Sequence, residues 1–137
     1  MEPIALHEET SRNFHLFWDN FPFPVMLVHR NRTILDRNKA AEALGLSTGT
    51  RCVDLGNRED HKGCLANKAL DEQTPKRTVA YVDAYAAVLD SYWIPLAGEK
   101  DMYIHYSADI SAYAAESLFP TKAEAAPARG CSSCSCT

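Results

Sequence analysis

The segment NKAAEALGL, residues 38–46, has the pattern of a short helix with a marked beginning and end. Asn38 is one of the residue types favoured at an N-cap, because its side-chain oxygen can accept a hydrogen bond from a free backbone amide of the first turn. Ala40, Ala41 and Leu44 lie at helical spacing, so we expect them to face inward. Gly45 is typical of the residue that follows a helix. The segment therefore predicts a helix over residues 39–44.

Two strands and a longer helix are predicted before this segment. Residues 25–29 form a short apolar run, residues 30–32 make a turn, and residues 33–35 complete a hairpin. Further upstream, residues 5–18 combine polar positions with an apolar side, which is typical of an amphipathic helix. That apolar side consists of Leu6, Phe14, Phe17 and Trp18.

A second helix and three strands are predicted after the segment. Asp60 is a suitable N-cap for a helix over residues 61–72. No helix interrupts the three strand-like segments that follow, at residues 77–83, 86–95 and 101–107. In the last of them, apolar and polar residues alternate with period two. A final helix is expected after Asp109, with Ile110, Tyr113, Ala114 and Leu118 at helical spacing.

This order of elements predicts an α+β domain in which five strands form one antiparallel sheet. The helices between the second and third strands are expected to cover one face of the sheet and to wall a cavity. We divide the chain into an N-terminal flanking helix (1–20), a central α+β domain (21–111), a C-terminal helix (112–119) and a flexible linker with a cysteine-rich tail (120–137).

The composition is that of one globular domain. The chain has 137 residues, of which 46% are hydrophobic and 23% are charged, and its net charge is -4. The acidic balance and the lack of a basic run argue against nucleic-acid binding through bulk electrostatics. We expect no membrane span, because no apolar run approaches the roughly 20 residues that a span needs. The first residues also lack the pattern of a secretory signal, so we expect a cytoplasmic location with reduced cysteines.

Four segments in this order resemble the PAS domain, a small sensory module of bacterial signalling proteins. They are Phe23–Val28, which is similar to the first strand of the family, Asn38–Leu46, which is similar to its first core helix, Tyr92–Leu96, which is similar to its fourth strand, and Asp109-Ile110-Ser111, which is similar to the end of its fifth strand. The resemblance implies a five-stranded antiparallel sheet with helices on one face, and a function in signal transduction.

The resemblance also implies a ligand pocket and a dimer. We expect a small molecule to bind between the sheet and the helices of residues 38–72, with the pocket lined by Val25, Leu27, Leu44, Leu65, Ile94, Met102, Ile104 and Tyr106. PAS domains commonly form homodimers through an N-terminal helix, and the stripe of Phe14, Phe17 and Trp18 fits that role. A signalling protein is the expected partner.

Five cysteines suggest a second kind of site. Gly49-Thr50-Arg51-Cys52, followed by a segment from Asp60 to Leu70 that contains His61 and Cys64, resembles PAS domains with cysteines before the long core helix. Imidazole and thiolate are good ligands for zinc or iron. Cys52, His61 and Cys64 are therefore candidate ligands, to which the tail residues Cys131, Cys134 and Cys136 could add a fourth. The same residues could instead be structural or act as a thiol-redox switch.

The candidate cofactors are, in order, zinc or an iron or iron–sulfur centre, haem with His61 as axial ligand, and flavin near Cys52. We expect His105 to point outward, on the face opposite Met102 and Ile104, and Trp93 to be a core or interface residue. No catalytic constellation is evident, so an enzyme is not expected. The main hypothesis is a free-standing sensor module, and the alternative is a metal-binding or thiol-redox sensor.

Overall fold

The computed structural model describes residues 5–55, 61 and 63–121. Its five strands form one antiparallel sheet in the order β2-β1-β5-β4-β3. The strands are β1 Val25–His29, β2 Ile34–Arg37, β3 Lys76–Val82, β4 Ala87–Leu96 and β5 Glu99–Asp109. The helices are α1 Glu8–Trp18, α2 Lys39–Ala43 and α3 Ala66–Glu72, with short 3-10 turns that include η1 Cys52–Asp54. The predicted α+β fold with an antiparallel sheet is confirmed.

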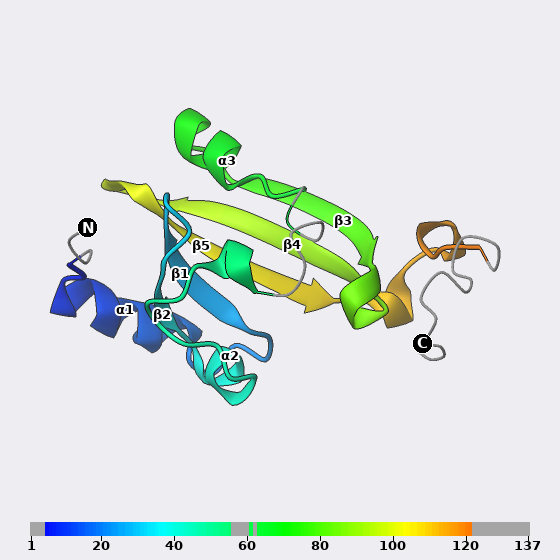
Figure 1. The fold of residues 1–137 in the computed structure, drawn as a ribbon, viewed down its shortest axis with the longest axis horizontal. Coiled ribbons are helices and arrows are strands. Elements are labelled where there is room, and N and C mark those ends of the chain that lie inside the picture. Colours follow the sequence, from blue (N-terminus) through cyan, green and yellow to red (C-terminus); the bar gives the residue numbers. More distant parts are fainter. Residues whose placement is uncertain (1–4, 56–60, 62, 122–137) are drawn as a thin grey trace.

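The last strand lies in the centre of the sheet, between β1 and β4 (Figure 1). The register sets Leu27 opposite Ile104 in the pairing of β1 with β5. It sets Trp93 opposite His105 in the pairing of β4 with β5. Side chains of β5 therefore contribute to the middle of both faces of the sheet.

The two faces of the sheet are covered by different helices. On one, here called the inner face, Val28, Ile34, Trp93 and Tyr103 pack against η1 and α3 through Cys52, Ala66, Ala69 and Leu70. On the other, the outer face, Phe14 of α1 packs against Val25, Leu27, Met102 and Ile104. The described residues thus form an inner and an outer apolar cluster, separated by the sheet.

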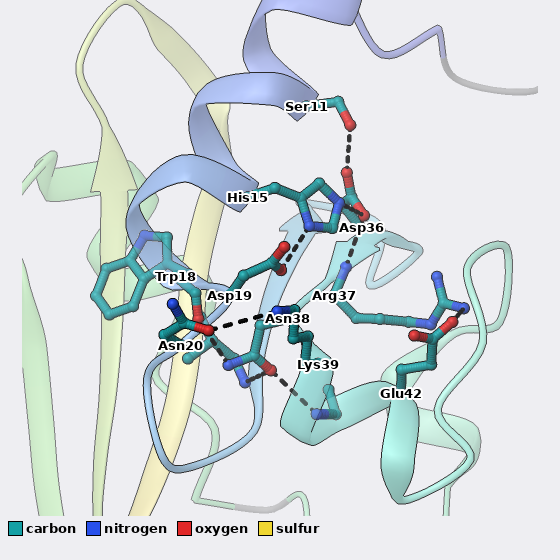
Figure 2. Close-up of polar contacts among 12 residues, drawn as sticks. Ser11, His15, Trp18, Asp19, Asn20, Asp36, Arg37, Asn38, Lys39 and Glu42 are labelled. Atoms are coloured by element: carbon teal, nitrogen blue, oxygen red, sulfur yellow. Dashed lines mark hydrogen bonds and ion pairs between the residues drawn. The ribbon is translucent and has the colours of Figure 1, made fainter.

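Asn38 joins three segments at the edge of the outer cluster (Figure 2). Its Oδ1 accepts hydrogen bonds from the backbone amides of Ala41 at 3.0 Å and Val25 at 2.9 Å, so the predicted N-cap is confirmed. Its Nδ2 donates to the backbone carbonyls of Trp18 and Phe23, each at 3.0 Å. One fully buried amide therefore fixes the end of α1, the start of β1 and the start of α2.

Two helix predictions are wrong in extent. The helix predicted over residues 61–72 begins only at Ala66, where buried residues at helical spacing begin. The predicted cap, Asp60, lies outside the described residues. The C-terminal helix predicted over residues 112–119 is two 3-10 turns, Ser111–Tyr113 and Glu116–Leu118. No apolar face of this segment is buried, and Tyr113 is 91% exposed, whereas short helices depend on such packing.

The helix expected over residues 5–18 starts at Glu8, and the one over residues 39–44 ends at Ala43. Leu44, expected to face inward, is the residue that follows the last turn of α2 and is 66% exposed, so this expectation is wrong. Among the described residues, no helix is long and apolar enough to cross a membrane.

Candidate functional site

Most of the predicted pocket residues lie on the outer face of the sheet and not on the inner one. Val25, Leu27, Ile94, Met102, Ile104 and Tyr106 all belong to the cluster around Phe14 of α1. Leu65 alone among the eight predicted residues packs against the inner cluster. The predicted pocket residues were therefore assigned to the wrong face of the sheet. Neighbouring residues of a strand point to opposite faces, so a choice that is off by one residue moves the whole set to the other face.

The inner face instead presents three ring side chains from β4 and β5. Trp93 and Tyr103 are buried, at 6% and 1% exposure. His105 is partly buried and stacks on Trp93, with ring centroids 4.8 Å apart and ring planes 16° apart. His105 does lie on the face opposite Met102 and Ile104, as predicted, but η1 and α3 cover that face, so the expectation that it points outward is wrong.

His105 is held as a neutral ring. Its Nδ1 lies 2.8 Å from the backbone carbonyl oxygen of Tyr92, which can only accept, so Nδ1 carries the proton and Nε2 keeps an acceptor lone pair. Burial lowers the pKa of His105 to about 4.

Cys52 and Tyr103 belong to the same cluster on the inner face of the sheet as Trp93. The two side chains influence each other's pKa, and burial raises the pKa of both the Cys52 thiol and the Tyr103 hydroxyl. The neighbouring Cys64 raises the pKa of Cys52 further, whereas Arg32 lowers it. A buried, protonated thiol is a poor nucleophile, so this environment does not favour thiol-redox chemistry at Cys52.

The predicted metal triad is not assembled. Within residues 5–55, 61 and 63–121, no three His, Cys, Asp or Glu side chains are grouped so that they could hold a metal ion. His61 Nε2 donates to the backbone carbonyl of Leu55 at 2.7 Å. His61 and Cys64 also precede α3, outside the helix that was predicted to begin at residue 61. Cys131, Cys134 and Cys136 lie outside the described residues.

A groove of about 360 Å³ runs along the outer face, between α1 and the sheet. Its walls include Asn13, Phe14, Phe17, Trp18, Leu27 and Ile104. Phe14 is 5% exposed and packs against its own sheet, so little of its side chain is available for the predicted dimer interface. Phe17 is 75% exposed, and Trp18 contacts the rings of Phe21 and Tyr106.

Polar contacts also attach α1 to β2 (Figure 2). Asp36 of β2 is 7% exposed and accepts hydrogen bonds from the Ser11 hydroxyl at 2.6 Å and from His15 Nε2 at 2.8 Å. The other ring nitrogen of His15 lies 2.7 Å from a carboxylate oxygen of Asp19. Sequence reasoning missed this group, because residues 15 and 36 come together only when α1 folds back on the sheet.

Several solved structures are similar to this fold, and PAS domains are among them. The PAS domain of BvgS from Bordetella pertussis has a TM-score of 0.59 at 19% identity, and the match covers 74% of this chain and 87% of that one. A domain of an HTR-like protein from Haloarcula marismortui has a TM-score of 0.54 at 22% identity, covering 65% and 98%. A sensory box sensor histidine kinase from Vibrio cholerae has a TM-score of 0.55 at 15% identity, covering 66% and 81%.

The sequence matches no family model, and no curated protein matches it significantly. The structural comparisons and the strand order together show that this chain has the PAS fold. The resemblance drawn from the four sequence segments is thereby confirmed for the fold.

Proposed function

We propose that this protein is a sensory module that binds a small, uncharged molecule on the inner face of its sheet. The observation that carries the proposal is the stacked pair of Trp93 and neutral His105 beside Tyr103, in the layer between the sheet and η1 and α3. Indole and phenol rings supply flat apolar surface, and His105 Nε2 supplies one oriented acceptor. Such a wall suits a partly aromatic ligand that donates a hydrogen bond.

The protonation states favour an uncharged ligand. At neutral pH, the raised pKa values of Cys52 and Tyr103 and the lowered pKa of His105 leave all three groups without charge. A charged ligand would lose its hydration against this wall without gaining an ionic partner among these three groups. Arg32, the cation that acts on them, already donates to the carbonyl of Arg30 at 2.6 Å and to Asn67 at 3.2 Å.

The sheet offers a direct path from the ligand to the flanking helix. Tyr103 and His105 face the proposed ligand, and Met102, Ile104 and Tyr106, which alternate with them on β5, contact the cluster beneath α1. A ligand shifts the position of α1 only to the extent that it binds one arrangement of these strands better than another. We therefore propose that α1 is the element that reports binding.

We also propose that signalling proceeds through contacts with other chains and without catalysis. The similarity to the structure of a sensor histidine kinase from Vibrio cholerae supports a signalling partner. For a homodimer, Phe17 is the available residue of the original stripe, and Leu16 beside it is 74% exposed. A cytoplasmic location and the absence of nucleic-acid binding stay predictions from the sequence.

The test is a screen of neutral aromatic fragments, observed by NMR on the 15N-labelled protein. We expect hits to shift the indole signal of Trp93 and the backbone amides of Tyr103 and His105. Replacement of His105 by Phe, which keeps a ring but removes the acceptor, should weaken the hits that donate a hydrogen bond, whereas Ile94→Val on the outer face should not. The proposal is wrong if no fragment binds, or if every hit shifts only residues of the groove beside α1.

A further inference from the structure

The attachment of α1 to the sheet depends on a histidine between two carboxylates. His15 Nε2 lies 2.8 Å from Asp36 Oδ1, and His15 Nδ1 lies 2.7 Å from Asp19 Oδ1. Ionised carboxylates only accept hydrogen bonds, so both contacts are satisfied together only when both ring nitrogens carry protons. In the neutral ring, one nitrogen lone pair would face a carboxylate oxygen at hydrogen-bond distance.

We propose that His15 is a pH-sensitive latch, which holds α1 on the outer face of the sheet as an imidazolium and weakens that hold when it loses its proton. The contact to Asp36 joins α1 to β2, whereas the contact to Asp19 lies within the N-terminal segment (Figure 2). Loss of the proton therefore weakens a tie between the helix and the domain. This inference does not depend on ligand binding at the inner face.

The charges around His15 support one direction of change. Asp19 from the end of α1 and Asp36 from β2 are the titratable groups that act on it, and the hydrogen bond to Asp19 and the charge of Asp36 raise its pKa above the ordinary value. The nearby cations contact other groups. The guanidinium of Arg37, the residue after Asp36 on β2, pairs with Glu42 at 3.0 Å, and Lys39 of α2 donates to the side chain of Asn20. On α1, the ring edge of Phe14 is the apolar neighbour of His15.

The direction of the pH dependence follows from the raised pKa of His15. A group whose pKa is higher in the docked state contributes its full stabilisation below the undocked value of about 6.5 and loses it as the pH rises through the docked value. The latch is therefore closed in mildly acidic solution and opens toward alkaline pH. Opening would uncover Phe14, Leu27 and Ile104, which now form the walls of the groove under α1.

The first measurement is the NMR titration of the His15 ring in the unmodified protein, followed by amide hydrogen exchange of α1 between pH 6 and 9, corrected for intrinsic exchange rates. We expect His15 to titrate above 6.5. We also expect the protection of α1 to fall by about two- to fivefold across this range, which is the effect of one partly exposed ion pair.

Three variants separate the latch from general loosening. In His15→Gln, the protection of α1 should be independent of pH. Ser11→Ala removes a hydroxyl donor to Asp36, and a serine hydroxyl carries no charge that changes in this pH range. The protection of α1 should therefore be lower at every pH but keep its pH dependence. The exposed His7→Gln should behave like the original protein. The latch is refuted if His15 titrates at or below 6.5, or if His15→Gln keeps the pH dependence.

Discussion

The imidazole of His105 lies flat against the indole of Trp93, with the two ring centroids 4.8 Å apart, on the face of the sheet that η1 and α3 cover. This pair defines the candidate ligand wall. It also gives the protein a group that must stay neutral in the folded state, because burial lowers the pKa of His105 to about 4. The pair therefore links the proposed function to a measurable dependence of stability on pH.

We expect the folded protein to lose stability as the pH falls from about 6.5 to about 4 because of His105. In this window the unfolded chain binds a proton at this residue that the folded chain does not, so the free energy of unfolding falls by about 3 kcal/mol by the acidic end. The free energy of unfolding, measured with urea at several pH values, checks this. The dependence should be flatter in His105→Phe than in the exposed His7→Gln, and equal slopes in the two variants would contradict it.

Replacement of Asn38 by Ala should be strongly destabilising. The variant leaves the backbone amide of Val25 and three backbone carbonyls without their partner in a buried place, so we expect a loss of about 2–4 kcal/mol in the free energy of unfolding. Asn38→Asp keeps the accepted bonds and loses the donated ones, and it should also be destabilised. Asn20→Ala, at an exposed site with one 3.5 Å contact, is the control and should change little.

Two leucines of the helices that follow β2 should respond very differently to truncation. Leu70 of α3 is 2% exposed, so Leu70→Ala should lower the free energy of unfolding by about 2–5 kcal/mol. Leu44→Ala removes the same atoms from a side chain that is 66% exposed, and should change it by less than about 0.5 kcal/mol. A large loss in Leu44→Ala would place this residue in the core after all.

The proposed homodimer can be tested at Phe17. Because Phe17 is 75% exposed, Phe17→Glu should leave the fold intact and convert the dimer to a monomer, as measured by light scattering. Phe17→Leu keeps an apolar side chain and should remain dimeric. A monomeric unmodified protein, or a dimeric Phe17→Glu, would show that α1 is not the interface. Phe14→Glu is unsuitable for this test, because it would bury a charge in the outer cluster, and we expect it to destabilise the domain.

The alternating residues of β5 show where sequence reasoning reached its limit. Period two revealed that Met102 and Ile104 share one face and that Tyr103 and His105 share the other, and both statements hold. The pattern is the same whichever face the middle helices cover. Which set of β5 residues lies under the middle helices is decided by the packing of Trp93 and Tyr103 against Cys52 and α3. These are contacts between distant parts of the chain.

The sequence by itself determined the local elements and their order, because Asn38, Gly45 and the strand periodicities act through neighbours a few residues away. The order of these elements predicted the antiparallel sheet, and four segments in that order carried the resemblance to PAS domains. Only the tertiary structure decided that α1 packs on its own sheet through Phe14, that Cys52, His61 and Cys64 form no metal triad, and that His15 meets Asp36. These are contacts over long separations, whose geometry is set by how the layers pack and not by any one segment.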